Sequence, residues 1–258
     1  MEKVTIPALR EMKRDGRKIV GVVAWDFQIA QIADRTGVEI VSVGDSVGIN
    51  LWGHSDLLEI TLDEMIIVCK AVRRGTKRAL VSCDLPLGSC QKGVDCTVRA
   101  AARIVEEAGA DMVKLDRAAD FPDAVTAIVR AGIPVFAQFE MIPQAAESMT
   151  SKLVAGAKRL EEEGASLVDF KHSGPVAGPA VVSAVSIPVI GGMGGGPWLD
   201  GRIRMAHAAI GYAASALESK TESYANVARI TLDALTAYAN DVRAGRQIKG
   251  GVPVKLQS

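Results

Sequence analysis

Aromatic residues are scarce in this chain of 258 residues: Phe, Trp and Tyr make up 4% of it, although 48% of its residues are hydrophobic. The apolar content is therefore mostly Ala, Val, Ile and Leu, the residues that fill buried parallel strands and the helices covering them. This composition excludes disorder and a collagen-like structure. A chain of this length can bury a large core, so we expect one domain spanning residues 1–258.

Charge of one sign is not in excess, because 30 Lys and Arg residues balance 30 Asp and Glu residues. No basic block is present that would follow a phosphate backbone, so we expect no nucleic-acid partner. Uninterrupted apolar runs long enough to span a bilayer are also missing, and the N-terminal segment is charged, without the apolar core of a signal peptide. These features predict a cytoplasmic protein that does not bind membranes.

Cysteine and histidine are few. The four cysteines have no paired ligand spacing, which predicts reduced thiols, and the three histidines lie too far apart in sequence to suggest a zinc site.

Short β-branched segments alternate with longer amphipathic ones, the pattern of parallel strands joined by helices. We predict strands at 19–24, 39–43, 79–83, 112–115, 134–138, 167–170 and 188–190, and a short eighth near 209–211. Helices are predicted at 27–35, 61–73, 94–108, 123–130, 152–163, 176–184 and 222–244. Because the connections are short and no linker divides the chain, the fold class is α/β, an eight-stranded (βα)8 TIM barrel. The alternative, an open doubly wound sheet, needs a glycine-rich turn after the first strand, where Trp25, Asp26 and Phe27 stand.

Polar side chains stand where the predicted strands end, the face that carries the chemistry of such barrels. They are Asp45 and Ser46, Asp84, Lys114 and Asp116, Gln138 and Glu140, and Asp169, Lys171 and His172. Converging carboxylates repel one another unless a cation neutralises them, and Asp45, Asp84 and Asp116 are hard oxygen donors. We therefore predict a Mg²⁺ site there. The alternative is that some of these residues only cap helices.

Lys114 alternates with Asp116, so both side chains point to the same face of their strand. A cation beside a metal-binding carboxylate suits an anionic ligand. A 2-oxo acid would chelate Mg²⁺ through its keto and carboxylate oxygens, and Lys114 would balance the remaining charge. In the alternative interpretation, Lys114 only pairs with the aspartates.

At these residues the sequence resembles the ketopantoate hydroxymethyltransferase family, almost from end to end. The resemblance rests on VGDSVG at 43–48, WGH at 52–54, TLDEM at 61–65, KAVRRG at 70–75, DLP at 84–86, GADMVKLD at 109–116, IPVIGGMGGG at 187–196 and DGRIRMAH at 200–207. It implies a Mg²⁺-dependent barrel of the phosphoenolpyruvate and pyruvate superfamily, usually a decamer. Its members take a C3 proton from 2-oxoisovalerate and add the one-carbon unit of methylenetetrahydrofolate, a step of pantothenate biosynthesis.

The resemblance also implies roles for individual residues. It makes Asp45 and Asp84 metal ligands, gives Ser46 and Lys114 to the 2-oxo acid, and places Asp116 in the metal shell, where the family has Glu. Gln138 stands where the family has a His near the substrate, and Glu140 where it has a Gly.

Lys171 is the most consequential departure, because the family has there the catalytic Glu that abstracts the C3 proton. Three roles remain open for it: a new base, a cationic contact for a substrate with an additional anionic group, or a Schiff-base nucleophile. The second is favoured, and Glu140 is a further candidate for a relocated base. A metal already polarises the carbonyl in such a site, which makes a Schiff base redundant.

We therefore expect a divergent member of the family that acts on a 2-oxo acid through a metal-stabilised enolate, as a homo-oligomer. The alternatives are a lyase or aldolase for a more anionic 2-oxo acid, and a noncatalytic paralogue. The last would have no reason to retain clustered like charges such as Asp45 and Asp84.

Overall fold

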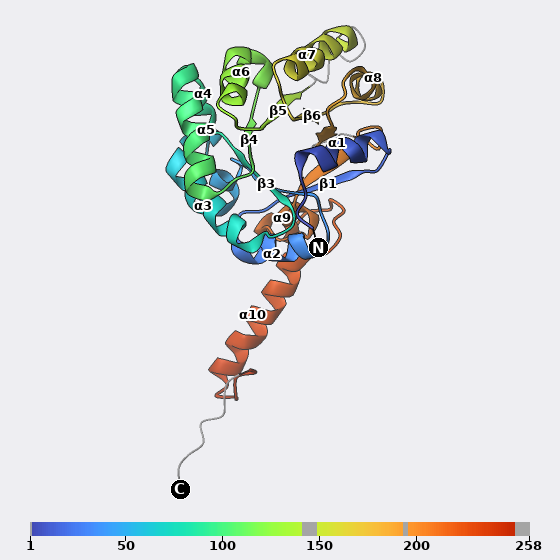
Figure 1. Ribbon diagram of the computed structural model, residues 1–258. Helices are drawn as coiled ribbons and strands as arrows, with labels where there is room; N and C mark the ends of the chain where they lie inside the picture. Colours follow the sequence, from blue (N-terminus) through green and yellow to red (C-terminus); the bar gives the residue numbers. More distant parts are fainter. Residues whose placement is uncertain (1, 141–148, 193–195, 251–258) are drawn as a thin grey trace. The chain divides into compact units, whose positions relative to one another are not determined.

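The computed structural model describes residues 2–140, 149–192 and 196–250. Eight parallel strands form a closed barrel in chain order (Figure 1). They are β1 (Ile19–Val23), β2 (Ile40–Val43), β3 (Leu80–Asp84), β4 (Met112–Leu115), β5 (Val135–Glu140), β6 (Leu167–Lys171), β7 (Val189–Gly191) and β8 (Gly201–Met205). Helices cover the outside of the barrel: α2 (Phe27–Arg35), α3 (Leu62–Gly75), α5 (Val94–Ala108), α6 (Pro122–Arg130), α7 (Thr150–Glu162) and α8 (Ala177–Ala184). The predicted fold class is confirmed.

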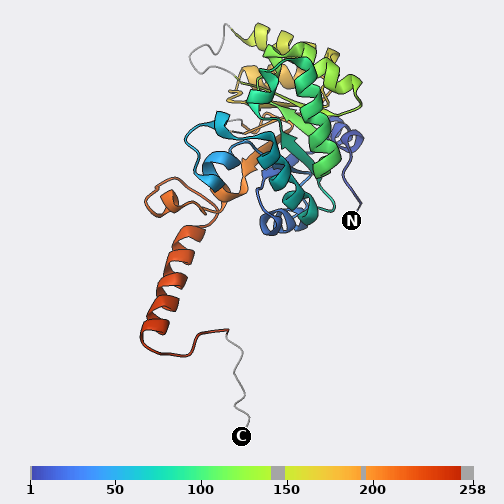
Figure 2. The same ribbon diagram turned by 90° about the vertical axis from the view of Figure 1, so that its left-hand side faces the viewer.

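The chain divides into two compact units, Met1–Ala206 and His207–Ser258. The first holds the barrel. The second holds α10 (Val227–Arg243), a continuous helix (Figure 2). It begins where the Asn226 side chain accepts a hydrogen bond from the Arg229 amide at 2.9 Å. Among the described residues, no helix has both the length and the apolar character needed to cross a membrane.

The first seven predicted strands agree with the structure to within two residues at each end, but the predicted eighth strand is wrong. Residues 209–211 lie at the end of the short helix α9 (Ala206–Ala209) and in the turn after it. The eighth strand of the structure is β8. Its sequence contains no apolar run, because two of its five residues are the exposed Arg202 and Arg204. Gly201 lets β8 approach β1 closely, since a Cβ there would lie 2.0 Å from the Ile19 carbonyl oxygen.

Two helices also differ from expectation. The final helix begins at Val227 rather than at 222, because Asn226 provides its cap. An N-terminal helix, α1 (Ile6–Arg14), was not predicted; the Thr5 side chain caps it, accepting from the Ala8 amide at 3.3 Å.

The barrel interior is apolar at the amino-terminal end of the strands. Each strand contributes one residue to this cluster: Ile19, Ile40, Leu80, Met112, Phe136, Leu167, Ile190 and Ile203. Leu9 and Met12 of α1 pack into the same cluster. The interior is thus filled at one end, and polar side chains occupy the positions further along the strands.

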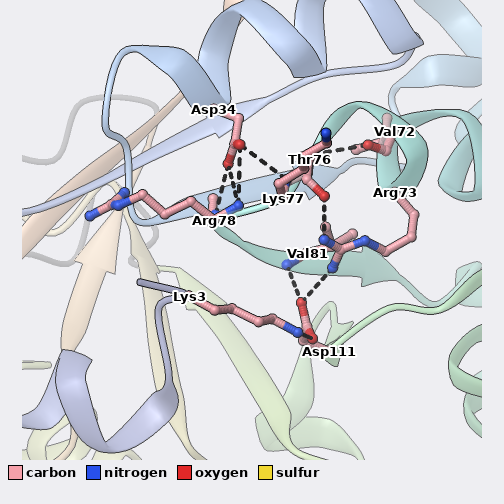
Figure 3. Close-up of polar contacts among 10 residues, drawn as sticks. Lys3, Asp34, Val72, Arg73, Thr76, Lys77, Arg78, Val81 and Asp111 are labelled. Carbon is pink, nitrogen blue, oxygen red and sulfur yellow. Dashed lines mark hydrogen bonds and ion pairs between the residues drawn. The ribbon is translucent and has the colours of Figure 1, made fainter. Parts of the chain in front are cut away.

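Two carboxylates form hydrogen bonds and ion pairs with the segments at the amino-terminal ends of β3 and β4 (Figure 3). Asp34, at the end of α2, accepts hydrogen bonds from the amides of Lys77, Arg78 and Ala79, the shortest at 2.8 Å. Asp111 accepts from the Val81 amide at 2.8 Å and pairs with Lys3 at 2.5 Å and Arg73 at 2.9 Å. Both carboxylates are therefore saturated with donors.

Candidate active site

Four polar side chains form a buried tier inside the barrel, beyond the apolar interior: Asp84 of β3, Lys114 of β4, Gln138 of β5 and Asp169 of β6. The strand register pairs Asp84 with Lys114 and Gln138 with Asp169. None is more than 6% exposed. Because side chains alternate along a strand, these four face inward while Val113 and Val168 face the helices. We call this set the lower tier.

Three charged residues form an upper tier nearer the barrel mouth. Asp116 lies two positions beyond Lys114, Lys171 ends β6 two positions beyond Asp169, and Asp45 follows β2. The Asp116 and Lys171 side chains are 19% and 22% exposed, so this tier is partly exposed while the lower tier is buried.

Lys114 lies at the centre of the carboxylates. Its Nζ is 3.1 Å from Asp116 Oδ1, 3.2 Å from Asp84 Oδ2 and 3.5 Å from Asp169 Oδ2. Burial alone would lower the pKa of Lys114, but the surrounding carboxylates outweigh it and raise the pKa well above its usual value. The side chain is therefore a permanent ammonium at the base of the site.

Asp116 has both oxygens engaged by cations. Its Oδ2 is 3.8 Å from Lys171 Nζ, while Oδ1 accepts from Lys114. Burial would raise the pKa of Asp116, yet Lys114 and Lys171, together with a hydrogen bond from Gln138, hold it below its usual range. Asp116 is thus ionised and bound to its neighbours.

Asp84, Asp169 and Asp45 show the opposite shift. Burial raises the pKa of Asp84 to about 7 despite Lys114, and Asp116 and Asp45 add to the increase. Burial also raises the pKa of Asp169, against the effect of Lys114 and Lys171, and burial and Asp116 raise that of Asp45. Oδ1 of Asp84 and Oδ1 of Asp169 are buried and have no hydrogen-bond partner among the described residues.

The residues at this end fit a Mg²⁺ ion. The Asp45 amide lies 3.4 Å from Asp84 Oδ2, so the two residues are neighbours, and Asp84 Oδ1 is a buried acceptor that lacks a donor. Within the described ranges, no group of three Asp, Glu, His or Cys side chains is arranged to hold a metal. Mg²⁺ in proteins is often bound by one or two carboxylates, with waters and ligand oxygens completing its shell. Asp45 and Asp84 satisfy that requirement.

The structure gathers most of the predicted site residues at this one end. Asp45, Asp84, Lys114, Asp116, Gln138 and Lys171 lie in the two tiers. Ser46 follows Asp45, and its hydroxyl lies 3.9 Å from the sulfur of Met205, so its predicted contact with the substrate stays a prediction. Glu140 ends β5, but its side chain lies outside the described part of the structure. His172 turns the chain out of β6 with φ of 52°.

Asp169 is the site residue for which the sequence analysis predicts no role. The alternation of β6 places it on the same face as Lys171, and this was the only available signal. Its burial, its 3.5 Å contact with Lys114 and its unpartnered oxygen depend on how strands distant in sequence come together, which periodicity does not report.

A closed parallel barrel with charged side chains clustered at the carboxyl ends of its strands has the architecture of the TIM-barrel enzymes, whose active sites lie at that end. The chain belongs to the ketopantoate hydroxymethyltransferase family, whose model matches residues 3–247. It is 37% identical to the 3-methyl-2-oxobutanoate hydroxymethyltransferase of Cyanothece sp., over 93% of this chain and 96% of that protein. The protein of the same name from Moorella thermoacetica is 36% identical and covers 95% of each chain.

Solved structures confirm the fold. A 2,3-dimethylmalate lyase, described as a PEP mutase/isocitrate lyase superfamily member, superposes with a TM-score of 0.63 at 16% identity, covering 94% of this chain and 99% of that one. A phosphonopyruvate hydrolase in complex with oxalate and Mg²⁺ gives 0.61 at 15% identity, covering 99% and 92%.

Proposed function

We propose that the protein is a Mg²⁺-dependent enzyme that forms or breaks a carbon–carbon bond of a 2-oxo acid through an enolate, as a transferase of the hydroxymethyltransferase type. The observation that carries this proposal is the Lys114 ammonium held among three carboxylates at the barrel mouth of a chain that belongs to this family. A fixed buried cation can stabilise the negative charge that an enolate oxygen acquires.

Asp45 and Asp84 would hold the metal ion, with Asp116 in its outer shell. When bound, Mg²⁺ supplies a positive charge that polarises the carbonyl of the 2-oxo acid. Lys114, Ser46 and Gln138 are the residues we assign to substrate binding. We assign methylenetetrahydrofolate as the one-carbon donor, as the family resemblance implies, in a reaction of pantothenate biosynthesis.

Lys171 favours a second candidate, a lyase or aldolase for a 2-oxo acid with an additional anionic group. Its side chain lies at the mouth, 22% exposed, and its nearest carboxylate, Asp116, is shared with Lys114. The ammonium is therefore accessible to a second carboxylate or a phosphonate. The sequence predicts two catalytic residues, Lys171 and Glu140. We assign Lys171 to this cationic contact with the substrate, and the role of Glu140 as a relocated base stays a prediction.

We also infer that the chain is a cytoplasmic homo-oligomer. Apolar side chains of α10, including Ile230, Leu235 and Tyr238, are each more than 50% exposed. An exposed apolar helix face of this kind marks a surface that associates. Sedimentation analysis of the full chain tests the inference, and a monomer at micromolar concentration would contradict it.

One experiment separates the candidates. A panel of 2-oxo acids is incubated with the protein and Mg²⁺ in deuterated water, and loss of the C3 proton is followed by NMR, with and without methylenetetrahydrofolate or an aldehyde. Exchange on 2-oxoisovalerate with product formation from the folate supports the transferase. Exchange confined to dicarboxylic 2-oxo acids favours the lyase or aldolase, and exchange on none of them would indicate a noncatalytic protein.

A further inference from the structure

Asp169 is a buried carboxylate for which neither the family nor the sequence analysis provides a role. It lies on β6, one inward-facing position before Lys171, the residue that replaces the family's base. We propose that Asp169 Oδ1 accepts the C3 proton of the 2-oxo acid, so that the base is displaced by two residues along the same strand. This inference rests on the proposed function and adds the residue that starts the reaction.

The other carboxylates described in the site already have a role or a partner. Asp116 faces Lys114 with one oxygen and Lys171 with the other. Asp45 and Asp84 are the pair that would hold the metal. Asp169 uses only Oδ2, at 3.5 Å from Lys114, and its Oδ1 has no hydrogen-bond partner among the described residues. A proton acceptor needs such a free lone pair.

The lysines are poor alternatives for this step. Lys114 Nζ lies within 3.5 Å of oxygens of three carboxylates, an arrangement that holds the side chain as an ammonium. Lys171 Nζ lies 3.8 Å from Asp116 Oδ2, and we assign this side chain to the cationic contact with the substrate's additional anionic group. An ammonium has no lone pair and cannot accept a proton.

The position of Asp169 suits the chemistry. Lys114 contacts Asp169, at 3.5 Å from its Oδ2, and in the proposed function Lys114 binds the substrate beside the oxygen on C2, which places C3, the next carbon, on the side of Asp169. When Oδ1 takes the proton from C3, the C–H electron pair forms the C2–C3 double bond and the carbonyl pair moves to the C2 oxygen. The resulting negative charge is balanced by the Lys114 ammonium, and the proton resides on Asp169 until it exchanges with solvent. The pKa of Asp169 is raised by burial, which makes its carboxylate a stronger base than an exposed aspartate.

The test compares Asp169→Asn with Lys158→Met, on the exposed face of α7, in the full chain with Mg²⁺. We expect Asp169→Asn to reduce C3 proton exchange of a substrate by 100- to 10,000-fold, the usual contribution of a general base. Lys158→Met should leave exchange within about threefold of the wild-type rate. Lys171→Met should raise KM, because the lysine contributes ground-state binding. Calorimetric binding of 2-oxoisovalerate should change little in Asp169→Asn, and thermal melting establishes that each variant is folded.

Chemical rescue separates a base from a merely structural residue. Formate added to Asp169→Ala should restore part of the exchange, and Asp169→Glu should retain some activity, whereas formate should have no effect on Lys171→Met. Wild-type exchange in Asp169→Asn would overturn the base role alone. A wild-type protein that exchanges no 2-oxo acid would overturn the proposed function, and the base role with it.

Discussion

The two ends of the barrel use aspartate in opposite ways. At the amino-terminal end, Asp34 is surrounded by backbone amides; burial would raise its pKa, but hydrogen bonds from Ala79, Lys77 and Arg78 lower it (Figure 3). At the carboxyl-terminal end, Asp84 and Asp169 are more deeply buried, and each has an oxygen that receives no hydrogen bond from the residues the structure describes. Burial raises the pKa of both.

This difference separates structural from functional carboxylates. A buried carboxylate that accepts several hydrogen bonds stabilises the fold, whereas one that lacks donors destabilises it unless a ligand supplies the missing partner. The positions of aspartate in the sequence do not distinguish structural from functional carboxylates. The number of hydrogen-bond donors around each carboxylate in the structure distinguishes them.

Replacing Asp84 should have the largest effect on activity. Asp84→Ala removes the buried oxygens that would hold Mg²⁺ with Asp45, so we expect Mg²⁺ binding to disappear from calorimetry and C3 exchange to fall about a thousandfold or more, equivalent to about 4 kcal/mol. The circular dichroism spectrum should stay that of a folded barrel. Unchanged Mg²⁺ affinity would exclude Asp84 as a ligand.

Asp34→Ala should have the largest effect on stability. It leaves three backbone amides without their acceptor, and we expect the free energy of unfolding at pH 7 to fall by about 2–4 kcal/mol. Urea denaturation measures this loss. Asp63→Ala is the matched control, because its side chain is 76% exposed and its ion pair with Arg103 should contribute less than about 1 kcal/mol. Equal losses in both variants would contradict the distinction between saturated and exposed carboxylates.

Lys114 tests whether the carboxyl-terminal cluster binds an anion. Lys114→Met should weaken binding of the 2-oxo acid by about 1.5–3 kcal/mol, the contribution of a charge-assisted hydrogen bond. Titration calorimetry measures it, and Lys158→Met on the exposed face of α7 is the control. A wild-type dissociation constant would mean that Lys114 only pairs with Asp84, Asp116 and Asp169.

Most of the fold and much of the site could be predicted from the sequence, because both depend on local patterns. Seven of the strands are short apolar segments between helical ones, and the strand-end positions of Asp45, Asp84 and Lys114 follow from the same alternation. β8 was missed because only Ile203 of its central residues faces the interior, so neither an apolar run nor its pairing with β1 can be recognised locally.

The role of Asp169 could not be predicted for a related reason. The alternation of β6 gives the direction of its side chain, but whether that direction leads to water, to a donor or to a lysine depends on the other strands. The same holds for Asp116, whose engagement by both Lys114 and Lys171 joins residues from β6 and from the region of β4. Tertiary contacts decide what a charged residue does after alternation has oriented it.

The smallest expected effect gives the sharpest comparison, because it has opposite signs at the two ends of the barrel. The folded-state pKa of Asp169 lies above its unfolded value, so ionising this residue costs stability as pH rises from the unfolded pKa, about 3.9, through the folded one. Asp169→Asn should therefore stabilise the metal-free protein by about 1 kcal/mol at pH 8 and have little effect at pH 3.5.

The folded-state pKa of Asp34 lies below its unfolded value, so the stabilisation that this carboxylate provides is fully present above about pH 3.9 and is lost as pH falls through the folded pKa. Asp34→Asn should be destabilising at pH 8 and less so at pH 3.5. Urea unfolding at both pH values measures all four differences, and a loss of stability in Asp169→Asn at pH 8 would show that the carboxylate is satisfied in the native state.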